Sequence, residues 1–172
     1  MKKFQFLLLD AGPIIKLFEL GIWDTFIKKC DITISKIVAD EAKWASQEFQ
    51  DISIDLEHYK EQIKIIDVEF SVVKTFYDKF KLLYQADIHD GEKETLAFLC
   101  DSSEKWLVCS ADRVVFKVLG LLGKANQGIS LEEILQKVGL SRQNLERKYT
   151  KKFREKHTRL GQVDSIQDKG LL

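Results

Sequence analysis

The chain has 172 residues, of which 45% are hydrophobic and 31% are charged. This length fits one domain that buries about two-thirds of its unfolded surface, and the composition excludes a disordered or low-complexity protein. Lysine and arginine (27 together) balance aspartate and glutamate (27 together), so net charge does not mark a nucleic-acid-binding protein and only the distribution of charge can.

The cysteines and the lengths of the apolar runs indicate a cytoplasmic protein. The three cysteines, Cys30, Cys100 and Cys109, lie in or next to apolar segments and have no CxxC spacing. Buried thiols in a reducing compartment explain this pattern better than disulfides or a zinc site. The first apolar run ends at Asp10, which is too early for a signal peptide, and no run approaches the ~18 residues of a membrane span. We therefore expect no membrane segment.

The first predicted element is a strand over Phe4–Leu9, because a short, continuous apolar run is typical of a strand buried on both faces. Asp10 follows it. Gly12 permits a tight turn and Pro13 suits the first turn of a helix, which we predict over residues 14–20. Ligands of open α/β sheets bind at the carboxyl ends of the strands, so Asp10 is a candidate binding residue. The alternative is that Asp10 only caps the helix.

Strands and helices then alternate along the chain. Short apolar or β-branched runs predict further strands at residues 31–37, 63–68 and 106–110. Helical spacing of apolar residues predicts helices at residues 23–27, 38–49, 71–84, 91–100 and 112–121, with residues 85–90 as a loop and a short amphipathic helix from Ile54 as one interpretation of residues 51–62. Asp90 is the expected cap of the helix at 91–100. This alternation predicts a parallel sheet with helices on both faces.

The pattern changes after Gly123. A loop leads to a short helix that Ser130 caps and Gly139 ends, and another helix is predicted from Ser141. That helix carries seven basic residues within thirteen positions: Arg147, Lys148, Lys151, Lys152, Arg154, Lys156 and Arg159. Residues 161–172 have no strong pattern and are expected to be mobile. The division is therefore a domain over residues 1–140, followed by a basic C-terminal helix and tail over 141–172.

Acidic residues fall at positions that can share one edge of the predicted sheet. They follow strands or begin helices, and they are Asp10, Glu41, Asp90, Glu92, Glu94 and Asp112. Any one of them could simply cap a helix or favour its dipole. Several carboxylates held together repel one another unless a cation lies between them, and Mg²⁺ and Mn²⁺ prefer oxygen ligands. The histidines are scattered, and we expect His89 to be a surface residue.

Four segments carry a resemblance to the PIN-domain family, in the family's order and with plausible spacing. These are LLLDAGPIIKL, ISKIVADEAKW, GEKETLAF and VCSADRVVFKVLG, within residues 4–135. The family includes many metal-dependent ribonucleases, among them VapC-like toxins of bacterial toxin–antitoxin pairs. The chain departs from the family after Leu121, where a fifth strand and a Gly-Thr motif are common. Here GKANQGIS offers Gly128 and Ser130 with Ile129 between them.

The resemblance implies a PIN-like three-layer α/β/α fold around a central, mainly parallel sheet of four or five strands. It implies hydrolysis of RNA with Mg²⁺ or Mn²⁺, in which a metal ion activates water and stabilises the transition state. The implied catalytic residues are Asp10, Glu41, Glu94 and Asp112. The implied metal ligands are Asp10, Glu94, Asp112 and Glu92. The RNA backbone would meet Lys148, Lys151, Lys152 and Arg154, unless this helix is only solvated or docks on a partner protein. An antitoxin protein and a second copy of the chain are the other implied partners.

Two other functions remain open. One is a non-catalytic PIN-like module that binds RNA or protein, which the filled acid positions disfavour. The other is a phosphatase of the haloacid dehalogenase type, suggested by the apolar strand that ends in Asp10. That family requires a second aspartate two residues later, where this chain has Gly12.

Overall fold

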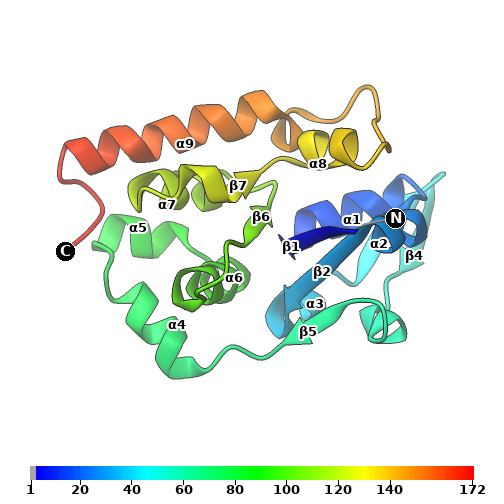
Figure 1. Cartoon of the computed structure of the whole chain (residues 1–172), viewed down its shortest axis with the longest axis horizontal. Helices are drawn as coiled ribbons and strands as arrows, with labels where there is room; N and C mark the ends of the chain where they lie inside the picture. Colours follow the sequence, from blue (N-terminus) through cyan, green and yellow to red (C-terminus); the bar gives the residue numbers. More distant parts are fainter. Residues whose placement is uncertain (1–2) are drawn as a thin grey trace.

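Figure 1 shows the computed structural model of the chain, which describes residues 3–172. Its centre is a five-stranded sheet in the order β5-β2-β1-β6-β7, and each neighbouring pair is parallel. The strands are β1 (Phe4–Leu9), β2 (Cys30–Ser35), β5 (Lys64–Ile66), β6 (Leu107–Cys109) and β7 (Gly128–Ile129). The predicted α/β class with a parallel sheet is confirmed, and β7 is the fifth strand.

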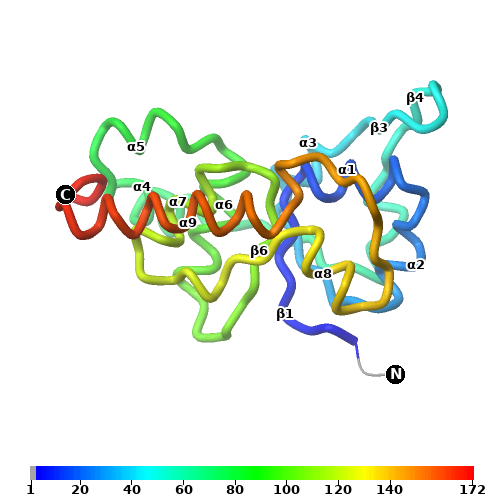
Figure 2. Tube along the Cα trace, turned by 90° about the horizontal axis from the view of Figure 1, so that it is seen from above, coloured from blue at the N-terminus to red at the C-terminus, as the bar shows by residue number. Residues whose placement is uncertain are grey.

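The helices of the described chain lie between and after these strands. They are α1 (Ala11–Glu19), α2 (Trp23–Lys29), α3 (Lys36–Glu41), α4 (Phe70–Tyr77), α5 (Leu82–Asp87), α6 (Asp90–Asp101), α7 (Arg113–Leu121), α8 (Leu131–Lys137) and α9 (Lys151–Ile166), with 3₁₀ turns at Leu56–Tyr59, Ala125–Gln127 and Arg147–Tyr149. A separate antiparallel hairpin, β3 (Trp44–Gln47) and β4 (Gln50–Ser53), projects from one end of the molecule (Figure 2). Within residues 3–172, none of the helices has both the length and the apolar character that crossing a bilayer requires.

Two hydrophobic cores lie on opposite faces of the sheet. Successive side chains of a strand point to opposite faces, so Leu7 and Leu9 of β1 pack into one core while Leu8 packs into the other. Side chains from α1, α2 and α8 fill the first core, and side chains from α4, α5, α6 and α7 fill the second. This arrangement is consistent with three layers, and it explains why β1 is apolar without alternation.

Helix α9 lies along α7, as Figures 1 and 2 show. The two helices approach closely where Gly120 of α7 meets Gly161 of α9. A Cβ atom at Gly120 would lie 2.0 Å from the backbone oxygen of Thr158, and one at Gly161 would lie 1.8 Å from the backbone oxygen of Lys117. Only glycine leaves room for this contact, so the C-terminal segment is packed tightly against the α/β unit.

The helix predicted over residues 38–49 is wrong in its second half. Helix α3 ends at Glu41, and Trp44 begins β3, which pairs with β4. Ala45 is buried, as helical spacing required, but in a strand that packs against α1. Residues 50–53 are also a strand, and the helix considered from Ile54 is only the 3₁₀ turn at Leu56–Tyr59. Pairing with a neighbouring segment outweighed a short helical pattern here.

The single helix predicted over residues 71–84 is two helices, and Gln85 continues the second of them instead of beginning a loop. The break lies at Phe80, which pairs with Leu171, while the N–H of Lys81 donates to the carbonyl of Gly170 at 2.7 Å. Leu83, whose helical spacing from Phe76 and Phe80 predicts burial, is 73% exposed. A contact with the far end of the chain therefore interrupts the helix.

The predictions for the C-terminal segment also need correction. No helix begins at Ser141; α9 begins at Lys151, where the side chain of Thr150 accepts from the N–H of Phe153. Residues 161–166, expected to be mobile, continue α9, and Leu171 packs against the second core. The tail is thus part of the packed structure.

Candidate functional site

The strand order reverses between β1 and β6. The chain runs outward from β1 through β2 to β5 and then returns to β6 on the other side of β1. Such a reversal leaves a crevice at the carboxyl ends of the two strands, where open α/β sheets bind their ligands. Asp10 directly follows β1, and Ser110 and Asp112 follow β6. We therefore take this crevice as the candidate site.

Ser110 connects the two aspartates. Its hydroxyl donates to Oδ2 of Asp10 at 2.6 Å and accepts from the N–H of Asp112 at 3.0 Å. Ser110 is fully buried. The sequence did not mark it as a site residue, because a serine after a strand is common. A buried hydroxyl with one donor and one acceptor partner holds the loop after β6 in a fixed position next to Asp10.

Asp10 is both a helix cap and a buried acid of the crevice. Its Oδ1 accepts from the N–H of Ala11 at 2.8 Å, and the residue is 5% exposed. Burial raises the pKa of Asp10, hydrogen bonds from Ser110 and Ala11 oppose the rise, and the charge of Asp112 adds to it. Asp10 therefore does cap α1, but a capping role does not explain why other acids lie near it.

Asp112 caps α7, as the sequence predicts. Its Oδ1 accepts from the N–H of Val114 at 2.8 Å. One ligand atom each from Asp112, Glu92 and His89 all lie within 4.8 Å of one another. His89 is exposed, as expected, and it lies at the edge of the acidic crevice. It is also the residue that precedes α6, so the predicted cap, Asp90, is instead the first residue of the helix.

Glu92 is the acid whose environment is most unusual. It is 9% exposed, and its Oε2 has no hydrogen-bond partner within residues 3–172. The pKa of Glu92 is raised to about 7, first by burial and then by the charges of Asp10 and Asp112. Oε2 lies 3.7 Å from Nδ1 of His89. A divalent cation bound here would relieve the repulsion between the carboxylates and could coordinate Oε2, so Glu92, Asp112 and His89 are the residues that could hold a metal ion.

Glu41 reaches the same crevice from α3. It is the last residue of that helix, whereas the sequence places it in a first turn. Burial and the charges of Asp10 and Asp90 raise its pKa, and the N–H of Gly91 lowers it. A Cβ atom at Gly91 would lie 2.7 Å from Oε2 of Glu41, so the glycine lets the Glu41 carboxylate lie against the start of α6 without moving.

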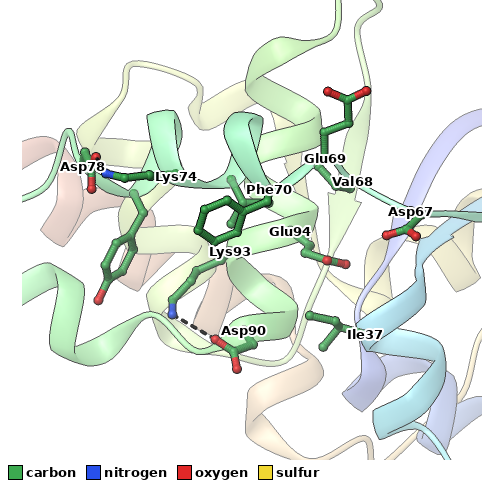
Figure 3. Close-up of a pocket in the computed structure, with 12 residues that line it drawn as sticks. Ile37, Asp67, Val68, Glu69, Phe70, Lys74, Asp78, Asp90, Lys93 and Glu94 are labelled. Atoms are coloured by element: carbon green, nitrogen blue, oxygen red, sulfur yellow. Dashed lines mark hydrogen bonds and ion pairs between the residues drawn. The ribbon is translucent and has the colours of Figure 1, made fainter.

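Glu94 lies on a different side of α6 from Glu92. Residues two apart on a helix are turned by about 200° and do not face each other. Burial raises the pKa of Glu94, hydrogen bonds from Ser35 and the N–H of Ile37 lower it, and the charges of Asp67 and Asp90 raise it. Neither Asp10 nor Asp112 is among these influences. The structure thus brings Asp10, Glu41, Glu92 and Asp112 together, whereas Glu94 faces a separate groove (Figure 3).

The basic residues of the C-terminal segment do not form one surface. Arg154 is committed to Glu133 through two hydrogen bonds of 2.7 and 2.8 Å, and its side chain is only 15% exposed. This ion pair competes with the predicted contact between Arg154 and RNA, which stays a prediction. Lys148, Lys151 and Lys152 are exposed. Lys151 lies 3.7 Å from Glu155, and Lys148 lies over the ring of Tyr149.

A different basic group lies close to the acids. Burial lowers the pKa of His157, the charges of Lys156, Arg113 and Arg147 lower it further, and the charge of Asp112 raises it. These charges all act on one imidazole, so the basic side chains lie in the same region of the molecule as Asp112. Arg113, Arg147 and Lys156 are exposed, and they place positive charge beside the crevice.

The raised pKa of Glu92 predicts a pH-dependent stability in the absence of metal. Between about pH 4.5 and 7 the folded state retains a proton that the unfolded chain releases, so the free energy of unfolding should fall as the pH rises through this range. A pKa raised from 4.5 to about 7 corresponds to about 3 kcal/mol of stability. Urea denaturation in EDTA at a series of pH values measures the effect.

The variant Glu92→Gln should show a flatter dependence on pH, and Glu61→Gln, which changes an exposed glutamate, should behave like wild type. An equally steep fall in Glu92→Gln would mean that another group titrates.

Comparisons of the chain with protein-family models, with curated proteins and with solved structures found no match.

Proposed function

We propose that the protein is a PIN-like ribonuclease that hydrolyses RNA phosphodiester bonds with Mg²⁺ or Mn²⁺. The observation that carries the proposal is the meeting of Asp10, Glu92 and Asp112 at the reversal of the strand order, where Oε2 of Glu92 is buried and lacks a partner among the described residues. Ligand atoms of Glu92 and Asp112 lie within 4.8 Å of each other and of one from His89, and carboxylate oxygens are the ligands that a hard divalent cation prefers. The order of the four family-like segments supports the same function.

The proposal gives each acid a role. Glu92 and Asp112 would hold the metal ion, which when bound supplies a hydroxide at neutral pH and neutralises charge on the phosphate. Asp10, fixed by Ala11 and Ser110, adds negative charge on the inner side of the site. Glu41 is more exposed, and its raised pKa suits a group that accepts a proton from water.

The RNA backbone would approach along Arg113, Arg147 and Lys156. The charges of these side chains and of Asp112 all act on the imidazole of His157. The exposed lysines Lys148, Lys151 and Lys152 would extend this path. Under the family resemblance, the protein would act as the toxin of a toxin–antitoxin pair, with an antitoxin protein and a second copy of the chain as partners.

The direct test is incubation of the purified protein with a labelled single-stranded RNA and with DNA of the same sequence. We expect cleavage of the RNA with Mn²⁺ or Mg²⁺ and none in EDTA. Binding of RNA without cleavage under either metal would favour the non-catalytic module instead. Release of inorganic phosphate from phosphomonoesters, with intact RNA, would favour the phosphatase.

The proposed RNA path predicts a specific salt dependence. Affinity for single-stranded RNA should fall with salt with a slope of about 0.7 per phosphate contact, so Arg113→Gln together with Arg147→Gln should reduce the slope by ~1.4. Fluorescence anisotropy in EDTA at several salt concentrations measures this slope without cleavage.

The matched control replaces Lys60 and Lys105, two exposed lysines that precede β5 and β6 at the opposite ends of the strands. This control should leave the slope unchanged. A slope that falls equally in both double variants would indicate diffuse attraction rather than an RNA path beside Asp112.

A further inference from the structure

A cavity of about 800 Å³ lies between α4 and α6 (Figure 3). Helix α3 and the segment that leads into α4 complete its walls. Apolar side chains form much of the lining, among them Ile37, Val68 and Val73. Its volume is within the range of about 300–1,000 Å³ that is typical of sites for small molecules. The crevice of Asp10 and Asp112 is separate, because neither residue lines this cavity.

The charged side chains around the cavity leave an excess of acid. Lys74 is paired with Asp78, and Lys93 is paired with Asp90 at 2.9 Å. The remaining lining acids are Asp67, Glu69 and Glu94. In the part of the chain that the structure describes, no lysine or arginine forms an ion pair with these three. The cavity therefore attracts positive charge and repels phosphates and carboxylates.

Glu94 supplies the most specific feature of the cavity. It is 8% exposed, and although its carboxylate accepts hydrogen bonds from Ser35 and the N–H of Ile37, its Oε2 is buried without a hydrogen-bond partner in residues 3–172. Figure 3 shows its carboxylate directed toward Asp67 and Ile37 at the end of the cavity. An acceptor that is buried and unpaired costs about 1–3 kcal/mol, and a bound N–H donor would remove that cost.

Aromatic rings form another part of the wall. Phe70 is 79% exposed although it lines the cavity. Nζ of Lys93 already lies 4.5 Å from the centre of the Tyr77 ring, so an ammonium group is compatible with this aromatic surface. Aromatic faces attract cations and also cover apolar groups, which suits a ligand that has both.

We propose that this cavity binds a small organic cation in which an ammonium or guanidinium group is joined to an apolar body. The cationic group would donate to Glu94 and face Asp67, and the apolar body would lie against Phe70 and Val73. This site goes beyond the proposed nuclease, since it uses neither Asp10 nor Asp112.

Tryptamine is a suitable probe, because tryptophol replaces its ammonium group by a hydroxyl and indole-3-acetate replaces it by a carboxylate. Titrations followed by calorimetry and by amide chemical shifts should show saturable binding of one tryptamine, with shifts at α4 and α6. Tryptophol should bind at least tenfold more weakly, and indole-3-acetate should not bind measurably.

Glu94→Gln should weaken tryptamine at least tenfold and leave tryptophol unchanged. Phe70→Ala alters an exposed side chain, does not threaten folding, and should weaken both. Glu57→Gln, an exposed acid elsewhere, controls for net charge. Absence of saturable binding, tryptophol binding as tight as tryptamine, or displacement of tryptamine by Mg²⁺ at equal concentration would overturn the proposal. Loss of ribonuclease activity would not, because these titrations use no RNA.

Discussion

Replacing Asp10 with asparagine is expected to reduce RNA cleavage by at least about 100-fold while the metal-free protein stays as stable as wild type or becomes more stable. Asparagine keeps the shape of the side chain and can still accept from the N–H of Ala11. The substitution removes a buried charge that raises the pKa of Glu92 and Glu41, so repulsion in the empty crevice falls. The same lost charge weakens metal binding and with it transition-state stabilisation.

The matched control is Asp55→Asn, because Asp55 also caps a helical turn, at Leu56–Tyr59, away from the crevice. Its activity should equal that of wild type. Thermal unfolding in EDTA and cleavage assays in Mn²⁺ provide the two measurements. If Asp10→Asn cleaves RNA at the wild-type rate, Asp10 only caps α1 and has no role in cleavage.

Gly161→Ala should lower the free energy of unfolding by about 3 kcal/mol, one of the largest effects of a single methyl group in this chain. The new Cβ atom would lie 1.8 Å from the backbone oxygen of Lys117 and 2.8 Å from the backbone nitrogen of Leu121. Backbone atoms of α7 cannot move aside as a flexible side chain would, so the helices must separate and lose their packing. The loss should occur even though alanine favours a helix over glycine by about 1 kcal/mol.

Gln162→Ala is the control for this second variant, since Gln162 is the next residue of α9 and is exposed. It should change the stability by less than about 0.5 kcal/mol. Urea denaturation of both variants in one buffer measures the difference. A Gly161→Ala protein as stable as wild type would show that α9 is not held against α7 by this close contact.

Local chemistry made several elements predictable from the residues alone. Phe4–Leu9 is a strand whose apolar second half, Leu7–Leu9, is buried on both faces. Asp112 and Ser130 cap helices because their side chains can accept from nearby N–H groups. Ser130 and Glu133 form a complete capping box, which is a strong short-range signal.

Other features could not be predicted because they depend on contacts between segments that are distant in the sequence. The helix break at Phe80 depends on Leu171, and the strand at Trp44 depends on pairing with Ser53. The burial of Arg154 depends on Glu133, so a run of basic residues could not reveal that one of them is an internal ion-pair partner. Periodicity within a window of residues contains none of this information.

The candidate site also has features that the sequence predicts and features that depend on tertiary contacts. Patterns of neighbouring residues were enough to predict that Asp10 and Asp112 follow two of the apolar strands and that the sheet is parallel. Only the tertiary structure showed that β1 and β6 are adjacent, that Ser110 joins their aspartates, and that Glu92 rather than Glu94 faces them. The physical reason is the orientation of helix α6 about its axis. Packing of Leu96, Ala97 and Leu99 into the second core sets this orientation, and it turns Glu92 and Glu94 toward different surroundings.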